Sequence, residues 1–208
     1  MRRGLLAAVL VEMAEQGRST AGLARDASES AVRAALAWDE AGWRWDRYGP
    51  LVMAAVRAGI PVAGANLPRA GLRASMADAT LDTALQAAAW QRQREDVRSG
   101  HCDLLPESQL GPMTRVQVAR DRTMADAVAR ALVPGRVVLL VAGGAHVLRQ
   151  TGVPEHLPAS VRARVVLALA GEAGASRAAQ ADQVWRTAAL PPQDYCTPLR
   201  ERMAPRKG

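Results

Sequence analysis

Phenylalanine is absent from the 208 residues of this sequence, lysine occurs only as Lys207, and aromatic residues make up only 3%. Leucine, valine, alanine and methionine must therefore fill most of the core. No apolar run reaches the roughly 18 residues of a membrane-spanning helix. Because 49% of the residues are hydrophobic and no long charged block occurs, the composition also excludes an intrinsically disordered chain.

Cysteine is scarce too, with Cys102 and Cys196 as the only two residues of this type. Their spacing matches no zinc motif. Both stand in polar, turn-rich surroundings, which favours a disulfide bond if the protein resides in an oxidising compartment. Two free thiols in the core are the alternative, and the sequence leaves both open.

The net charge of +7 and the isoelectric point of about 10.8 come almost wholly from arginine. These arginines are spread along the chain among aspartate and glutamate residues, so we expect no nucleic-acid partner. The length and composition fit one domain with its own core. We predict this domain at residues 1–199 and a disordered tail at 200–208.

Residues 1–11 (MRRGLLAAVLV) look like a signal peptide, because two arginines precede a short apolar run. Glu12 and Glu15 follow at once, and neither a clear cleavage site nor a lipid-accepting cysteine is nearby. We therefore interpret residues 8–11 as a buried strand that ends at Glu12. On this interpretation we expect no export signal in the chain, and membrane association only through a lipid anchor that the chain lacks.

Further apolar runs at residues 60–65, 136–142 and 164–169, with a weaker one at 182–185, predict more strands. The runs are nearly continuous, which is typical of strands buried on both faces of a parallel sheet. Helical patterns lie between the strands, at residues 28–38, 49–58, 78–98 and 113–132. The order predicts an α/β fold, a mostly parallel sheet flanked by helices in a single domain.

Polar residues follow three of the predicted strands. Glu12 ends the first strand, Asn66 follows the second, and His146 follows the third after two glycines. The carboxyl ends of parallel strands lie at one edge of a sheet, and ligands bind there. Each residue alone could be a cap or turn residue, but the three together favour a site.

The predicted helix at 113–132 carries Gln117 and Arg120 inside its apolar stripe, with Asp121 at the border. A polar side chain on a core-facing stripe needs a partner or a cavity. Arg120 is therefore either half of a buried ion pair or a clamp for the carboxylate of a ligand.

Trp38, Trp43, Trp45 and Tyr48 form a local aromatic cluster. The cluster is either a packing centre between helices or a surface for a flat apolar ligand such as a porphyrin, for which Tyr48 offers a phenolate. His156 is interpreted as a surface loop residue. No dinucleotide-binding glycine motif, phosphate loop or Gly-x-Ser-x-Gly elbow is present.

Several short motifs occur in a characteristic order: residues 45–50 (WDRYGP), 65–69 (ANLPR), 101–102 (HC), 117–125 (QVARDRTMA), 142–147 (AGGAHV), 152–154 (GVP) and 194–196 (DYC). Through them the chain resembles the ChaN-like haem-binding uptake proteins, a bacterial branch of the Tiki superfamily, from residue 8 to residue 198. The resemblance implies an α/β fold and haem binding in iron acquisition. It also implies an envelope-associated or lipid-anchored protein of the periplasm or the outer-membrane periphery.

The chain departs from this family pattern at its start. Family members carry an earlier strand with a Gly-Glu-x-His-type motif, which these 208 residues do not contain. Residues 143–146 (GGAH) match the second of the paired Gly-x-x-His elements that metal-dependent hydrolases of the wider superfamily carry. We therefore expect an exposed sheet edge and the loss of half of any such metal site.

Three hypotheses about function follow. The first is a haem-binding protein without turnover, closed by a homodimer, in which Arg120 or Arg69 holds the propionates and Tyr48, His101 or His146 faces the iron. Asn66 and Gln117 complete this haem site. The second is a metal-dependent hydrolase with Glu12 and His146 on a divalent ion. The third is a truncated remnant without activity.

Overall fold

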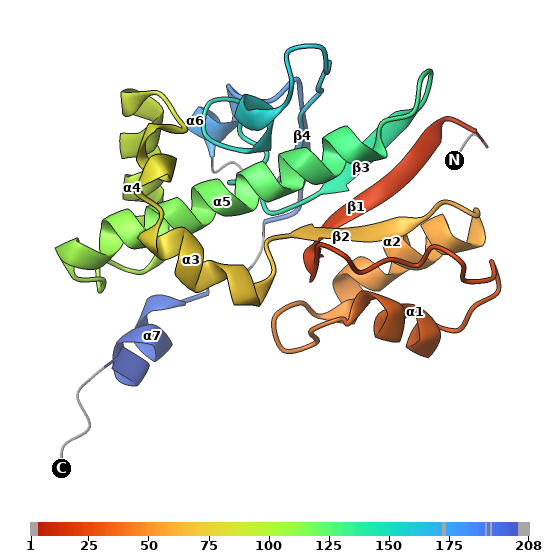
Figure 1. The fold of residues 1–208 in the computed structure, drawn as a ribbon. Coiled ribbons are helices and arrows are strands. Elements are labelled where there is room, and N and C mark those ends of the chain that lie inside the picture. The colour runs from red at the N-terminus through yellow and green to blue at the C-terminus, as the bar shows by residue number, and fades with distance from the viewer. Residues whose placement is uncertain (1–3, 172–173, 190, 192, 204–208) are drawn as a thin grey trace.

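The computed structural model describes residues 4–171, 174–189, 191 and 193–203 (Figure 1). The strands are β1 (Leu6–Glu15), β2 (Val62–Asn66), β3 (Val137–Val141), β4 (Val166–Ala170) and β5 (Gln183–Thr187). The helices are α1 (Glu29–Leu36), α2 (Trp45–Arg57), α3 (Leu72–Ala77), α4 (Ala87–Gly100), α5 (Glu107–Ala131), α6 (Ala175–Ala178) and α7 (Cys196–Met203). Short 3-10 helices lie at Arg69–Gly71, Ala79–Thr83 and Val153–His156.

A parallel sheet with the strand order β2-β1-β3 forms the centre of the fold. Val9 in the central strand lies opposite Val62 of β2 and Leu139 of β3. The predicted α/β class with a parallel sheet is confirmed, and so is the strand interpretation of the first apolar run. β1 is longer than predicted and continues past Glu12 to Glu15.

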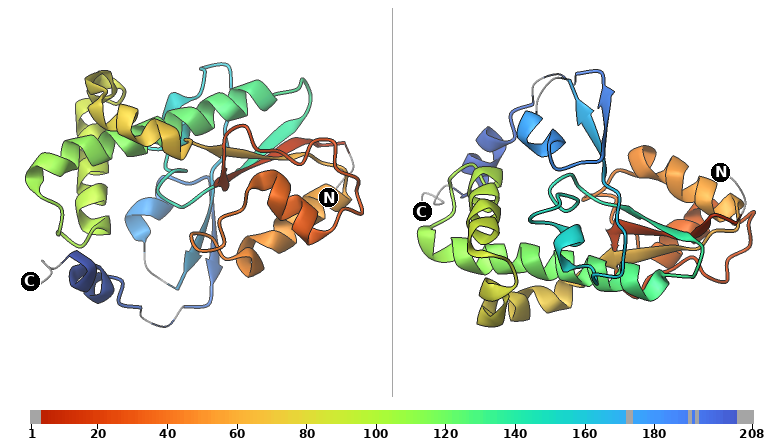
Figure 2. Two further views of the ribbon diagram at one scale, coloured as in Figure 1. Left: turned by 60° about the horizontal axis from the view of Figure 1, so that its bottom comes forward. Right: turned by 90° about the horizontal axis from the view of Figure 1, so that it is seen from above.

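Successive residues of β1 point to opposite faces of the sheet and enter two different cores. Val9 and Val11 pack with α1 and α2 on one face, whereas Ala8 and Leu10 pack with α5 on the other. Figure 2 shows α5 on one side of these strands and α1 and α2 on the opposite side. This sandwich explains the continuous apolar run, because both faces of the strand are buried.

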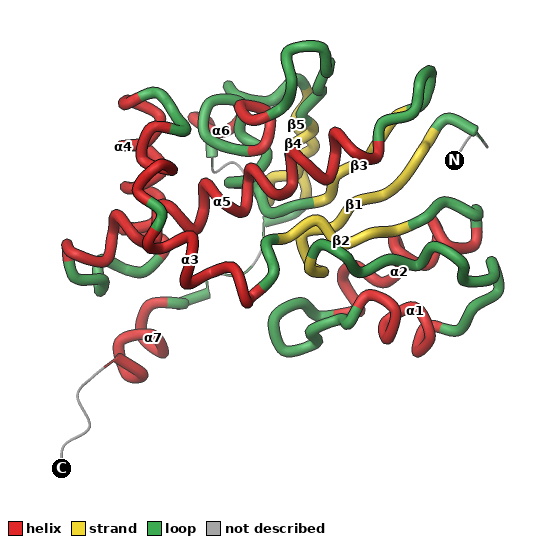
Figure 3. Tube along the Cα trace, viewed as in Figure 1, coloured by secondary structure: helices red, strands yellow, loops and turns green. Residues whose placement is uncertain are grey.

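The strands β4 and β5 form a separate two-stranded parallel sheet (Figure 3). The single sheet expected from the sequence is thus divided in the described part of the chain. Val166 of β4 and Trp185 of β5 remain 44% and 58% exposed. The two strands pair with each other, but they are not buried on both faces as the strands of the central sheet are.

The helix predicted at residues 78–98 is also divided. A 3-10 helix at Ala79–Thr83 is capped by Asp78, and α4 begins only at Ala87, after an extended Gln86. The longest helix, α5, starts at Glu107 and continues through Pro112, where the sequence had predicted a start at residue 113. Its predicted apolar stripe is confirmed, because Val116, Met124, Ala127 and Val128 are buried.

A disulfide bond joins Cys102, just after α4, to Cys196 at the start of α7, with 5.6 Å between the Cα atoms. Of the two alternatives left by the sequence, the structure therefore contains the bridge. Residues 200–203, expected in a disordered tail, are helical in α7, and residues 204–208 lie outside the described residues. No helix in the described ranges is long and apolar enough to cross a membrane.

Candidate functional site

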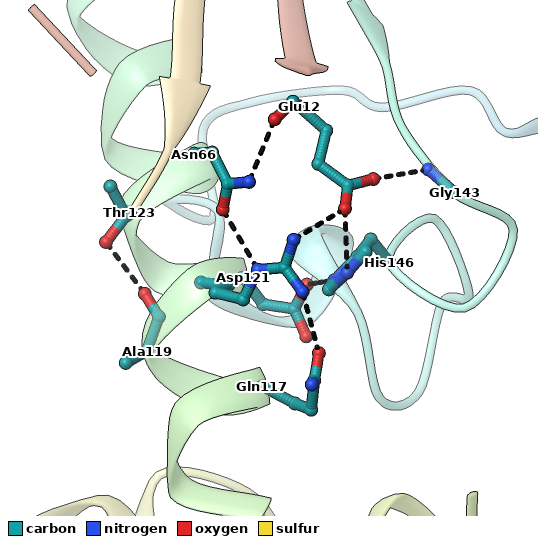
Figure 4. Close-up of polar contacts among 9 residues, drawn as sticks. Glu12, Asn66, Gln117, Ala119, Asp121, Thr123, Gly143 and His146 are labelled. Carbon is teal, nitrogen blue, oxygen red and sulfur yellow. Dashed lines mark hydrogen bonds and ion pairs between the residues drawn. The ribbon is translucent and has the colours of Figure 1, made fainter. Parts of the chain in front are cut away.

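Glu12, Asn66 and His146 lie together at the carboxyl edge of the central sheet, as the sequence predicted (Figure 4). The Glu12 carboxylate is buried, with its Oε2 accepting the backbone N–H of Gly143 at 2.6 Å. Its Oε1 lies 3.4 Å from His146 Nε2. Asn66 donates its side-chain amide to the backbone carbonyl of Glu12 at 2.9 Å. The expectation that three strand ends would meet is therefore confirmed.

Arg120 reaches this cluster from α5 and is fixed by hydrogen bonds from three of its nitrogens. Nη2 donates to Glu12 Oε1 at 2.8 Å, and Nε donates to Asn66 Oδ1 at 2.9 Å. Nη1 donates to Gln117 Oε1 at 3.5 Å. The first alternative offered by the sequence, a buried ion pair, is thus present with Glu12 as the partner, while 22% of the Arg120 side chain stays exposed.

Asp121 is the member of the cluster that sequence reasoning did not select. It lies at the border of the α5 stripe, yet it is fully buried, and its Oδ1 contacts His146 Nδ1 at 2.6 Å. The other oxygen, Oδ2, has no hydrogen-bond partner within the described part of the chain. The signal that could have found it was the same polar interruption of the stripe that identified Arg120.

The carboxyl groups of Glu12 and Asp121 and the imidazole of His146 shift one another's pKa values. Burial alone would lower the pKa of His146, but hydrogen bonds to Asp121 and Glu12 raise the pKa to about 9. Burial raises the pKa of Asp121 to about 6, against the lowering effect of His146. Burial also opposes ionisation of Glu12, but the contacts with His146, Gly143 and Arg120 hold its pKa below the usual value. His146 is therefore an imidazolium at neutral pH.

Glu12 and His146, the metal ligands of the hydrolase hypothesis, are close together but are already bound to each other and to neighbours. Each imidazole nitrogen of His146 contacts a carboxylate oxygen. Each Glu12 oxygen accepts a hydrogen bond, one from Arg120 and one from the backbone of Gly143. Among residues 4–171, 174–189, 191 and 193–203, no group of three metal-ligating side chains occurs. A catalytic metal normally needs three protein ligands, so this geometry does not fit one.

A cavity of about 640 Å³ opens beside the charged cluster, beyond the carboxyl ends of β1 and β2. Its volume lies within the range of small-molecule sites. Four of the predicted site residues are in its wall, together with residues of β1, α5 and the two loops that follow α1 and β2. The lining residues are Met13, Ala14, Glu15, Arg18, Leu36, Ala37, Asp39, Gly42, Trp43, Asn66, Leu67, Arg69, Leu72, Met113, Val116, Gln117 and Arg120.

The chemistry of this cavity is amphipathic. Trp43, Leu67, Leu72 and Val116 give it apolar walls. Its charged lining consists of three guanidinium groups and two carboxylates, from Arg18, Arg69, Arg120, Glu15 and Asp39, so positive charge is in excess. This combination suits a flat apolar molecule that carries carboxylates, because a guanidinium binds a carboxylate with two parallel N–H groups. The residues present therefore fit a haem group.

The predicted iron ligands lie elsewhere. Of the described residues that line the cavity, none is Tyr48, His101 or His146. The Tyr48 ring packs against Trp38 and Trp43 at centroid distances of 6.2 and 5.8 Å. His101 ends α4, where its Nδ1 donates to the Val97 carbonyl at 2.7 Å. The aromatic cluster is thus mainly a packing centre, of which only Trp43 reaches the cavity.

His156 differs from the surface residue that was expected. It is half-buried in a 3-10 helix, and its Nε2 has no partner among the described residues. Burial, reinforced by the nearby charge of Arg122, lowers its pKa to about 4. His156 is therefore neutral and does not take part in the charged cluster.

Comparisons with known proteins identify the family and agree with the fold. Residues 2–157 match the family described as haem-binding uptake, Tiki superfamily, ChaN. The fold is similar to a solved structure described as cofacial haem binding to ChaN of Campylobacter jejuni, with a TM-score of 0.58 and 22% sequence identity. The match covers 73% of this chain and 62% of that one, so the chain spans less than two thirds of the length of this relative. No curated protein sequence matches.

Proposed function

Because this chain belongs to the ChaN family of haem-binding uptake proteins in the Tiki superfamily, we propose that it binds haem in the cavity beside Arg120. The single observation that carries this proposal is the wall of the cavity, in which apolar side chains and three arginines face the same space. Haem is the cargo of such a protein, so the site has to bind and release it rather than transform it.

Arg120 and Arg69 are the residues that would hold the propionates. Arg120 is held in one orientation by Glu12, Asn66 and Gln117, so little side-chain freedom is lost when a carboxylate binds. Arg69 also lines the cavity, where its side chain is 76% exposed and paired with Asp39. One guanidinium that is held rigidly and one that is largely exposed can each bind a carboxylate.

Met13 and Met113 are the cavity residues whose side chains haem iron accepts as neutral ligands. Met13 is almost fully buried in β1, whereas Met113 of α5 is half-buried and more accessible. We therefore propose Met113 as the residue that would offer the iron a ligand. Tyr48, also half-buried, contacts Trp43 with the ring centroids 5.8 Å apart and does not line the cavity.

A homodimer and a place in an iron-uptake system complete the proposal. ChaN of Campylobacter jejuni binds haem cofacially, and a face-to-face pair of haems in this protein would require two cavities to meet. The Cys102–Cys196 disulfide supports an oxidising compartment such as the periplasm, because such bonds persist there and are rare in the cytosol.

A hemin titration followed by absorbance tests the proposal on the intact chain. We expect a saturable shift of the Soret band. Removing the positive charge with Arg69→Gln should weaken hemin binding roughly three- to tenfold, because one charge-assisted contact with a propionate is lost. Arg73→Gln is the matched control, since Arg73 is an exposed neighbour that does not line the cavity. No saturable shift with the unmodified chain would overturn the haem assignment.

A further inference from the structure

An ion pair joins two residues that line the cavity. Asp39 Oδ2 lies 2.5 Å from Arg69 Nη2, and both residues line the cavity wall. Asp39 belongs to the loop between α1 and α2, whereas Arg69 follows β2, thirty positions later in the chain. The pair therefore connects two separate walls of the site.

The Asp39 loop is held in shape by contacts of its own. Asp39 Oδ1 accepts the backbone N–H groups of Ala41 and Gly42 at 3.2 and 3.3 Å. The indole of Trp38 donates to the carbonyl of Trp43 at 2.7 Å. One Asp39 oxygen thus shapes the loop, while the other is left for Arg69.

The opposite wall is also fixed without the ion pair. The backbone N–H of Arg69 donates to Glu15 Oε1 at 3.0 Å, which ties the start of the 3-10 helix to the end of β1. Only the Arg69 side chain is engaged by Asp39. Both partners are accessible, with 76% of the Arg69 side chain and 39% of the Asp39 side chain exposed. Exposed pairs of this kind are weak and exchange readily.

We propose that Asp39 competes with the ligand's carboxylate for Arg69 and so sets the affinity of the cavity for haem. In the empty protein Asp39 occupies the guanidinium, and a propionate displaces it on binding. The inference rests on the proposed haem function. It adds Asp39, which lowers the affinity for haem, to the arginines that provide this affinity. A cargo protein gains from such a residue, because the same carboxylate promotes release.

Asp39→Asn is the sharpest variant, because the amide oxygen can still accept the N–H groups of Ala41 and Gly42 while the negative charge is removed. We expect it to bind hemin roughly two- to fivefold more tightly than the unmodified chain, the range set by a typical exposed ion pair. The gain should shrink at high salt. Asp46→Asn is the control, since Asp46 pairs with Arg44 on the surface and does not line the cavity.

Two further measurements isolate the competition. Hemin dimethyl ester has no free carboxylates, so its affinity should be the same for the Asp39→Asn and unmodified proteins. In an Arg69→Gln background, Asp39→Asn should have no effect on hemin binding, because the contested group is gone. The midpoint of thermal unfolding verifies that each variant is folded.

The outcomes separate this inference from the haem assignment. If the unmodified chain binds hemin and Asp39→Asn binds it equally or more weakly, the competition is wrong while the haem site stands. If Asp39→Asn raises the affinity for hemin and for its ester equally, the variant has only made the cavity more accessible. This result would also overturn the proposed competition. If neither protein binds hemin, the proposed function fails and this inference with it.

Discussion

Individual residues of the charged cluster have different tasks, although they contact one another. Glu12 is 2% exposed and contacts both Arg120 and the imidazolium of His146. Asp121 supplies the second negative charge, so that two carboxylates face two cations in a buried environment. A buried charge without its partner is costly. The negative charges of the cluster therefore stabilise Arg120 in one orientation beside the cavity.

The protonation of His146 gives the cluster a testable pH dependence. Its pKa of about 9 in the fold lies above the usual value of 6.5, so the folded protein binds the proton more tightly than the unfolded chain. The stability that this provides is fully present below pH 6.5 and is lost as the pH rises through 9. We expect the free energy of unfolding to fall across this window by an amount on the order of 3 kcal/mol.

Denaturant unfolding at a series of pH values measures this loss. His146→Gln should remove the fall in the free energy of unfolding between pH 6.5 and 9. The control is His101→Gln, because His101 is a half-buried histidine bonded to a backbone carbonyl, and this variant should keep the fall. A curve for the unmodified protein without any decline in this window would contradict the assignment of an imidazolium.

Two elements place the site, the end of β1 and the helix α5. Between Val11 and Glu15 the central strand advances four residues while β2 advances only from Gly64 to Asn66, so β1 bulges at this point. The bulge carries Glu12 and Met13 to the edge of the sheet. Opposite it, α5 presents Gln117, Arg120 and Asp121 from consecutive turns.

Gly64 is required where this bulge crosses β2. A Cβ atom at Gly64 would lie 2.1 Å from the Glu15 carbonyl oxygen and 2.7 Å from that of Ala14, both of them backbone atoms. We expect Gly64→Ala to lower the free energy of unfolding by about 3 kcal/mol in denaturant titrations and to weaken hemin binding. Gly100→Ala, with nothing within 4 Å of the added methyl group, should cause no loss. Equal stabilities for the two variants would refute the close approach.

The sequence predicted the elements whose pattern is local and strong. The runs that became β1, β2 and β3 are apolar throughout, and the polar residue after each one identified the edge where Glu12, Asn66 and His146 meet. It could not predict that β4 would pair away from the central sheet, because that depends on strand partners rather than on the strand's own residues. The helix predicted at 78–98 is divided at Gln86, whose backbone is extended before α4 begins, and no proline or glycine in the sequence marks this break.

At the scale of the whole molecule, the cavity is built from segments that are distant in the chain. Only those site residues that also carried a local signal could therefore be predicted from the sequence. Arg120 and Arg69 were identified from a polar interruption and a family motif, and both line the cavity. Asp39 and Met113 were missed, because nothing local distinguishes a residue that faces a cavity from one that faces solvent. Tyr48 and His101 were chosen for their ligand chemistry alone, which says nothing of where the fold places them.

Occupation of the cavity by haem is the central claim, and a variant that fills the cavity tests it most directly. Leu72 lines the cavity at the start of α3 and is half-buried, so Leu72→Trp would extend an indole into the space with little change to the core. Its exposed neighbour gives the control Arg73→Trp. In hemin titrations followed by absorbance, we predict at least roughly tenfold weaker binding for Leu72→Trp and unchanged binding for Arg73→Trp, in line with the cost of overpacking a fitted site. Equal hemin affinity for the two tryptophan variants would place haem elsewhere and contradict the account.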